Sequence, residues 1–321
     1  MAVRILVLSW AVLIAVIITP LAEASENNTV SFMPAWTVNE TAKYLVKKSK
    51  TDARGTQSAT MPLSVRVAGK TADGYIFECQ YDNFDTDIDI PVDLKKILVE
   101  INQGMKIKYA TDKYGGFQKK INLDEIQAWT EASLARYIAS IPDEVVRAGI
   151  SKLVSDSMKI KGAVSASASR EISYLHNPYF LGQEFEVDEK YMAEVILPNI
   201  FNPPQPYFGV VFMTASRGGG FKQMLIEQEI DKQKSAVILA DTLGKMAVAN
   251  NVGQPDVNLK ITNVELKDFF CYSFKESGNW VEKALPTRKI IVGGYTREET
   301  LEFIRQQWKL FVNRYVVVRK L

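Results

Sequence analysis

Few side chains in this sequence are candidates for catalysis, and the strongest candidate is the only histidine, His176. His176 lies in the segment from Tyr174 to Pro178. Sites of the Ser-His-Asp or Cys-His type need a base whose pKa lies near neutrality, and His176 alone could be that base. Because neither cysteine lies beside it in sequence, we interpret His176 as a structural residue. The sequence offers no catalytic residue, and we expect a protein that is not an enzyme.

Metal-ligating side chains are equally sparse. Zinc centres need several His or Cys ligands at close spacing, and one His with two distant Cys does not provide them. The sequence therefore predicts no zinc enzyme and no cofactor.

Four carboxylates form the densest group of potential ligands: Asp82, Asp85, Asp87 and Asp89. If this segment is extended, the last three lie on one face and could bind Ca²⁺. The run does not match an EF-hand loop, because Ile90 and Lys96 stand where that loop needs Gly and Glu. Two other interpretations stay open: an acidic and solvated strand edge, or the pair of carboxylates of a glycosidase, which would have to face each other across a cleft.

The two cysteines, Cys79 and Cys271, each follow an apolar run. An oxidising compartment would permit a disulfide between them, and the bond would join the two halves of the chain. Two buried free thiols are the alternative, since Cys is often fully buried.

Aromatic residues are frequent enough to line an apolar groove, although they could equally form the core. The ones singled out are Trp36, Tyr44, Tyr179, Phe180, Phe201, Tyr207, Phe208 and Phe212.

The first residues have the pattern of a signal peptide. Arg4 precedes an apolar run from Ile5 to Ile18, Pro20 ends that run, and Ala22-Glu23-Ala24 offers a cleavage site. The run is shorter than the roughly 20 apolar residues of a spanning helix. We therefore expect residues 1–24 to be removed and the mature protein to be soluble, either in the periplasm or at the cell surface.

Composition excludes other classes of protein. Lys and Arg number 39 against 37 Asp and Glu, which gives no general electrostatic reason to bind nucleic acid or an anionic membrane. The Gly-rich segment Arg217–Gly220 lacks the Lys-Ser/Thr of a P-loop. Length favours one large or two medium domains, and the small and polar segment 159–169 suggests a boundary between residues 25–165 and 166–321.

The first half is predicted to contain two hairpins and several helices. Alternating apolar residues and Gly-containing turns predict hairpins over residues 62–81 and 105–121. Helical spacing predicts helices over residues 91–101 and 123–156, with a capping box that begins at Asn122. In the last of these helices, the side chains expected to point inward are Val145, Val146, Ile150, Leu153 and Val154.

The second half is predicted to follow a similar order. Strands are expected over residues 207–214 and 221–230. A hairpin is expected over 259–283, with a turn at Lys267-Asp268, a returning strand over 269–274 and a tip at 276–279. A capping box at Thr296 predicts a terminal helix. Its apolar face would contain Leu301, Ile304, Trp308 and Phe311. Either the halves are a repeat, or common motifs recur by coincidence. The fold class is therefore α+β, with bent antiparallel sheet packed on helices.

This layout of hairpins and helices resembles exported envelope proteins of Gram-negative bacteria, in particular the lipoprotein carriers. The resemblance lies in the hairpins over 62–81, 105–121 and 259–283, interrupted by helices near 91–101 and 123–156. It implies a strongly bent antiparallel sheet that wraps helices.

Such a sheet, incompletely covered, would leave a concave apolar face. Our first hypothesis is a non-catalytic periplasmic or cell-surface binding protein that shelters a lipid or another apolar ligand there. A structural or adhesive envelope protein with a protein or glycan partner is the alternative. A hydrolase that uses carboxylates alone is the third.

Overall fold

The structure of the chain is a computed structural model. It describes residues 28–53, 55–81, 85–86, 92–158, 171–197, 205–241, 264–292 and 295–306.

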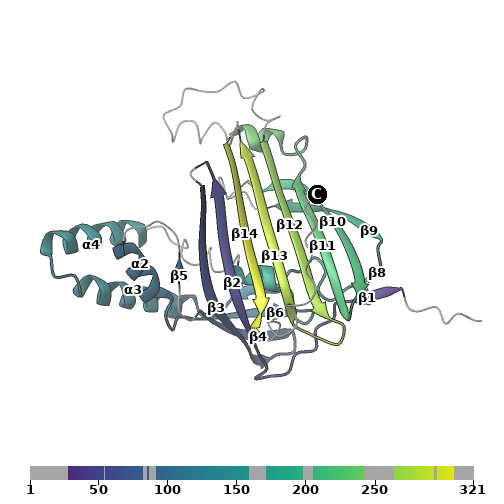
Figure 1. The fold of residues 1–321 in the computed structure, drawn as a ribbon, viewed down its shortest axis with the longest axis horizontal. Coiled ribbons are helices and arrows are strands. Elements are labelled where there is room, and N and C mark those ends of the chain that lie inside the picture. The colour runs from purple at the N-terminus through teal and green to yellow at the C-terminus, as the bar shows by residue number, and fades with distance from the viewer. Residues whose placement is uncertain are drawn as a thin grey trace, which may run out of the picture.

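The fold is dominated by one large antiparallel sheet of twelve strands that does not close (Figure 1). In spatial order its strands are β7 Phe117–Lys120, β6 Lys106–Asp112, β4 Gly74–Tyr81, β3 Gly55–Lys70, β2 Thr41–Asp52, β14 Tyr295–Arg305, β13 Val281–Val292, β12 Val264–Lys275, β11 Phe221–Ile230, β10 Tyr207–Gly218 and β9 Lys190–Leu197. The short β5 Asp85–Thr86 pairs with β3 off this path. A separate pair joins β1 Thr29–Ser31 to β8 Glu184–Glu186.

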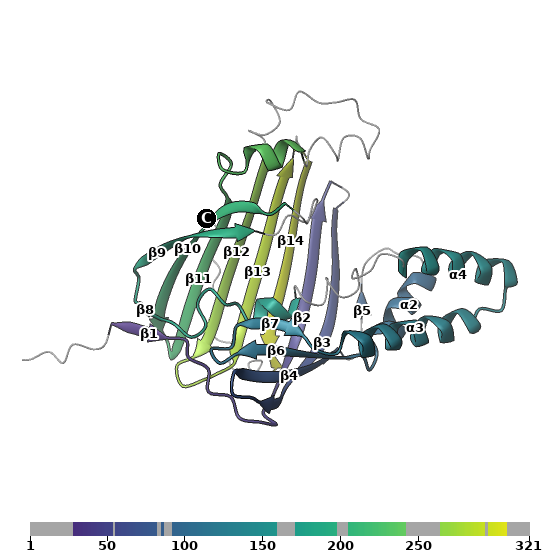
Figure 2. The same cartoon turned by 180° about the vertical axis from the view of Figure 1, so that it is seen from behind.

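The sheet is strongly bent, as predicted. Strands β4, β6 and β7 run across one end of the long strands, so that the sheet has an inner and an outer face (Figure 2). Along β3, Met61, Leu63 and Val65 are buried while the residues between them are less so. This alternation with a period of two favours a β-strand and determines which face of it is buried.

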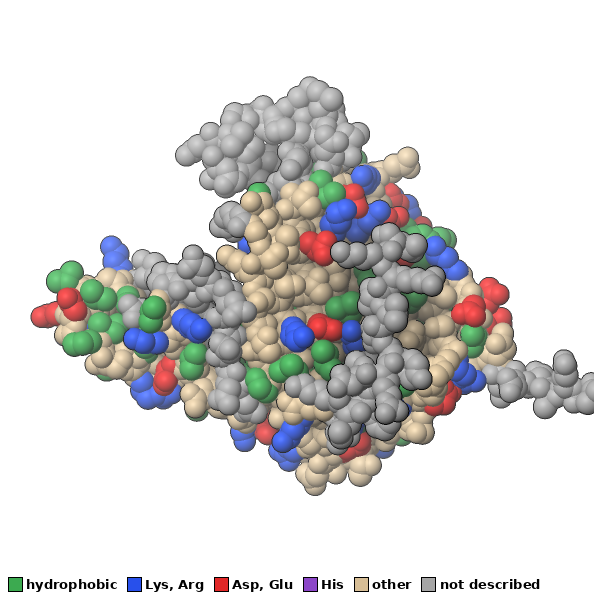
Figure 3. Space-filling view, in the orientation of Figure 1, with side chains coloured by type: hydrophobic (Ala, Val, Ile, Leu, Met, Phe, Trp, Pro, Cys, Tyr) green, Lys and Arg blue, Asp and Glu red, His purple; other side chains and the backbone are tan. Residues whose placement is uncertain are grey.

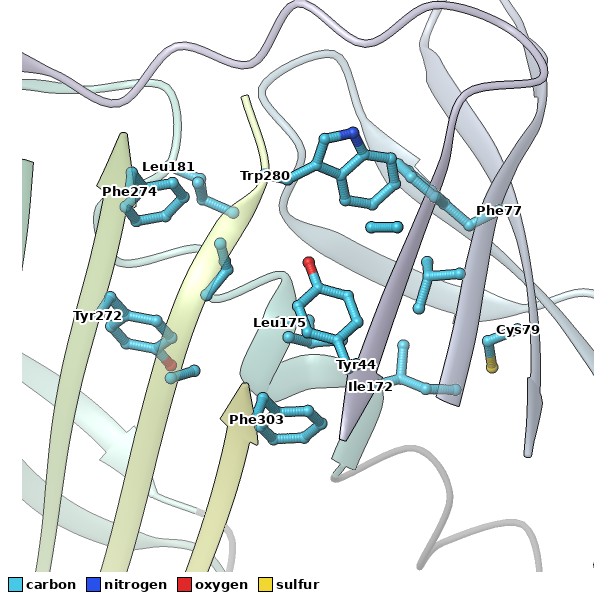
Figure 4. Packing of buried hydrophobic residues seen from close by; sticks show 14 of the residues in the cluster. Tyr44, Phe77, Cys79, Ile172, Leu175, Leu181, Tyr272, Phe274, Trp280 and Phe303 are labelled. Carbon is cyan, nitrogen blue, oxygen red and sulfur yellow. The ribbon is translucent and has the colours of Figure 1, made fainter. Parts of the chain in front are cut away.

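The inner face is covered by the chain itself. Residues 171–187, which we call the inner segment, cross it (Figure 2). Ile172 and Leu175 lie near Tyr44 and Phe303 of the sheet (Figure 4). Further along the segment, the buried Phe180 packs on Tyr272 with ring centroids 4.8 Å apart. The inner segment therefore fills this part of the concavity with side chains.

Three helices form an arm at the β3 side of the sheet: α2 Val92–Asn102, α3 Leu123–Ala139 and α4 Glu144–Met158 (Figure 1). Their small core contains Ile97, Leu134, Tyr137 and Ile141. All three helices were predicted, although Asn122 makes no side-chain cap to α3. Its amide instead accepts from the Lys108 N–H at 2.8 Å and donates to the Lys106 carbonyl at 3.0 Å, which fastens the arm to β6.

The predicted orientation of α4 is wrong for two residues. Val145 is 81% exposed and Val146 is 44% exposed, whereas both were expected to point inward. Ile150 is partly buried against the arm's core, as expected. The Asp143 carboxylate caps the helix by accepting from the N–H groups of Val145 and Val146 at 2.9 Å. Within the described residues α4 packs mainly on α3, so one side of the helix stays in solvent.

Two predictions in the second half are also wrong. The segment expected to open a helix at Thr296 is strand β14, with Leu301 and Phe303 buried at a spacing of two. The turn expected at Lys267-Asp268 is absent, because these residues lie inside the continuous strand β12. In both cases pairing with flanking strands of the large sheet overrides the local signal. The hairpins over 62–81 and 105–121 are confirmed.

Strands from both predicted halves share the large sheet, and β2 pairs directly with β14. The fold is thus mostly β rather than evenly α+β. The proposed boundary at 159–169, together with Trp308 and Phe311, lies outside the described residues. No helix in the described part of the chain has the length and apolar character needed to cross a membrane.

Candidate binding surfaces

A row of polar side chains crosses the inner face from strand to strand. The cross-strand register aligns Gln228 with Asp268, Asp268 with Arg288, Arg288 with Glu299 and Glu299 with Lys50. Apolar clusters lie on both sides of this row, one with Phe270, Tyr272 and Leu301 among its members and another with Leu266 and Ile290. The row therefore divides the inner face into two apolar regions.

The strongest interaction in this row is an ion pair. Arg288 donates from Nε and Nη2 to the two carboxylate oxygens of Asp268, at 2.6 and 2.5 Å. The Asp268 side chain is 5% exposed and the Arg288 side chain 12%. Burial lowers the pKa of Arg288, but the hydrogen bonds and charge of Asp268 outweigh it and the pKa is raised. The Arg288 guanidinium thus stays charged and remains hydrogen-bonded to Asp268.

A second network ties the inner segment to the sheet. The Glu171 carboxylate accepts from Lys48 Nζ at 2.9 Å and from the Tyr81 hydroxyl at 2.8 Å. A hollow of about 20 Å³ beside it is lined by Lys48, Glu171, Arg288 and Glu299, among others, which is room for about one water molecule. Asp268 is already paired with Arg288, and Glu171 with Lys48. This part of the inner face therefore stabilises the fold and offers little room for a ligand.

His176 anchors the next part of the inner segment. It is 2% exposed, and its Nδ1 lies 3.0 Å from the Gly115 carbonyl, which can only accept. The other nitrogen, Nε2, then accepts from the Tyr109 hydroxyl at 2.8 Å. Burial lowers the pKa of His176 to about 4, against smaller raising effects of Gly115 and Asp112. The residue is buried and neutral at neutral pH, in agreement with the structural interpretation.

The other predicted site residues are not brought together. Asp85 lies in β5, opposite Thr60 of β3, while Asp82, Asp87 and Asp89 lie outside the described residues. Cys79 and Cys271 are free thiols, the first buried and the second half-buried. Four strands separate Cys79 in β4 from Cys271 in β12. In the described part of the chain, no group of His, Cys, Asp and Glu could hold a metal ion.

An apolar surface lies on the outer face at the β9 end of the sheet. We call it the outer patch, and its members are Met192, Ile196, Phe208, Phe212, Leu225 and Phe269. The cross-strand register places Ile196 beside Phe208, and Met192 beside Phe212. Met192 and Ile196 are each 68% exposed, and Phe208 is 45% exposed. Figure 3 shows this side of the molecule, with hydrophobic side chains between charged ones.

Sequence reasoning found this surface only in part. Phe208 and Phe212 were among the aromatics that could line a groove, whereas Trp36, Tyr44 and Phe180 of the same set are core residues. Met192 and Ile196 were missed, although their even spacing in an alternating segment places them on one face.

Two shallow hollows adjoin the outer patch. One of about 280 Å³ is lined by Phe212 and Phe269 together with Glu227, Glu229 and Lys267. The other, of about 300 Å³, is bordered by Glu265 and Lys232, shares Glu229 and Lys267, and lies behind Ile230 and Leu266, whose side chains belong to the inner-face cluster. Lys267 pairs with Glu229 at 3.6 Å and with Glu265 at 3.5 Å. The surface thus offers the apolar rings of Phe212 and Phe269 beside a group of side chains of both charge signs.

No family model and no curated protein matches the chain. A structure that describes lipid–protein interactions in lipovitellin is 6% identical with a TM-score of 0.43, and the match covers 85% of this chain but only 25% of the lipovitellin chain. An outer membrane lipoprotein-sorting protein domain from Vibrio parahaemolyticus is 12% identical with a TM-score of 0.16, over 84% of this chain and 88% of that one. Both TM-scores are too low to assign a shared fold, and both identities are too low to assign a function.

Proposed function

We propose that this chain is an exported, non-catalytic binding protein that holds the acyl chain of an amphipathic lipid against the outer patch. The observation that carries the proposal is the exposure of Met192, Ile196 and Phe208 on one face. Contiguous apolar surface on a soluble protein is typical of an interaction site. Export to the periplasm or the cell surface is supported by the signal-peptide pattern of residues 1–24.

The two hollows favour a lipid over a compact apolar ligand. Each approaches the lower size of a small-molecule site, and together they extend from Phe212 of β10 and Phe269 of β12 to Lys232. An acyl chain would lie on the two aromatic rings. Its polar end would reach Lys232 and the paired charges around Lys267. Our first hypothesis placed the ligand on the concave inner face. Among the described residues, the hollow beside the polar row of that face measures about 20 Å³.

Native mass spectrometry of the mature protein, purified without detergent, tests whether a lipid is bound. We expect a mass excess that disappears when the same sample is denatured, with a lipid as the released species. A bare polypeptide mass, together with no uptake of added fatty acid, would contradict the proposal.

Replacing both Phe212 and Phe269 by glutamine tests where the lipid lies. We expect affinity for a fluorescent fatty acid, measured by titration, to fall about 30-fold, because loss of two apolar contacts removes roughly 2 kcal/mol. Val145→Gln is the matched control, since it removes an 81% exposed apolar side chain from the helical arm. Equal affinity of the double variant and this control would place the ligand elsewhere.

A further inference from the structure

Strand β9 is the last strand of the large sheet, and among the described residues it pairs only with β10. Its register with β10 is continuous from Lys190 to Leu197, without a bulge, and the strand contains no proline. Exposed edge strands are usually protected by prolines, bulges or short length, because their free N–H and C=O groups can pair with another strand. Strand β9, with eight residues, has none of these three protections. It does carry a fourth, charged side chains, in Lys190 and Glu194.

The charged residues of β9 are spaced so that the strand complements itself. Lys190, Met192 and Glu194 alternate with other residues and therefore lie on the same, outer face. In an antiparallel pair, directly opposite residues share a face. A two-fold axis through Met192 places Lys190 of each copy opposite Glu194 of the other. Two ion pairs then flank a central Met192–Met192 contact.

Other symmetric registers lack this match. An axis through Glu194 would set two glutamates against each other, and an axis through Ala193 would set Lys190 against Ile196 and Met192 against Glu194. Like charges directly opposite are destabilising, and opposite charges are stabilising. Charge therefore favours the register centred on Met192.

The two charges are already held near the outer face. Lys190 Nζ lies 4.3 Å from the centre of the Phe212 ring. Glu194, with its side chain 73% exposed, accepts from Lys234 Nζ at 2.6 Å. Both groups can thus meet a partner strand with little rearrangement.

We infer that β9 pairs antiparallel with β9 of a second copy of this chain, in the register that sets Lys190 against Glu194. The product is a closed dimer with two-fold symmetry, in which one sheet runs through both copies. The outer patches of the two copies become continuous across Met192. This inference does not depend on whether a lipid is bound.

A charge swap in the mature protein tests the register. We expect sedimentation velocity to show a dimer, and Lys190→Glu or Glu194→Lys alone to weaken it by about tenfold or more, because each change converts two attractive pairs into two repulsive ones. The double variant with both changes should regain affinity within roughly threefold of the unmodified protein, since both pairs are restored with the signs exchanged. That recovery separates pairing from a general loss of folding.

A bridging reagent for thiols gives an independent readout. In a Cys271→Ser background, a short bifunctional reagent should join two copies of Met192→Cys, and should join Ile196→Cys poorly. A monomer at every concentration would overturn the inference. So would a dimer that neither single charge reversal weakens, or one that crosslinks through position 196 rather than 192.

Discussion

Replacing Asp268 by alanine is expected to destabilise the fold by about 3–5 kcal/mol, because it leaves the Arg288 guanidinium buried without its counter-ion. Both carboxylate oxygens accept from Arg288, at 2.6 and 2.5 Å, and the arginine side chain is only 12% exposed. Gln228, whose Nε2 lies 3.3 Å from Asp268, also loses a partner. Urea unfolding followed by circular dichroism would measure the change in the free energy of unfolding.

Two further variants show whether the unpaired charge is the cause. Asp268→Leu combined with Arg288→Met removes both charges, and we expect most of the lost stability to return, since apolar side chains of similar size can replace a buried pair. Glu276→Ala is the matched surface control. It breaks the Arg217–Glu276 pair, whose side chains are each 43% exposed, and should cost no more than about 1 kcal/mol. Equal losses for Asp268→Ala and Glu276→Ala would show that the inner pair is not buried as described.

Acidification is expected to remove about 3 kcal/mol of stability through His176 alone, between pH 6.5 and about pH 4. The unfolded chain binds a proton at His176 below its ordinary pKa of 6.5, whereas burial in the folded state lowers the pKa to about 4. The unfolded state therefore holds more protons in this window, and stability falls as the pH falls. Above pH 6.5 the ring is neutral in both states, so the full contribution is present there.

The measurement compares the unmodified protein with His176→Gln in urea at a series of pH values. Glutamine does not titrate, and its amide can still donate to the Gly115 carbonyl. We expect the free energies of unfolding of the two proteins to converge, by about 3 kcal/mol, as the pH falls from 6.5 to 4. Other titrating groups contribute equally to both curves and cancel. Parallel curves would mean that His176 is accessible to protons in the folded state.

Local pattern was sufficient for the hairpins over 62–81 and 105–121 and insufficient for strand β14. Leu63, Val65 and Val67 alternate with less buried residues and are followed by a Gly-containing turn, so their strand can be recognised from a short window. In β14 the residues from Thr296 to Glu299 match a capping box, and Leu301 and Ile304 match a helix. The segment is nevertheless a strand because β2 and β13 pair with its two sides, and β2 is remote in sequence.

The outer patch was harder to predict for a related reason. Tyr207 and Phe208 are consecutive aromatic residues of one strand, but Tyr207 is 2% exposed and Phe208 is 45% exposed. Alternation shows that they lie on opposite faces. Which face is buried depends on where residues 171–187 pack, and no local pattern in β10 contains that information. The absence of a catalytic residue remains a prediction.

The pairing of β2 with β14 also determines the order in which the fold can assemble. The N-terminal part of the chain is synthesised first, so β2 can pair with β3 soon after synthesis. Its other partner is β14, the last strand of the described chain. Contacts between such distant segments form slowly, because a long loop must close first. Until β14 is made, one long edge of β2, near Tyr44 and Val46, is unpaired and could pair with an incorrect strand. Nascent chains of this protein should therefore depend on a chaperone for longer than its short hairpins would suggest.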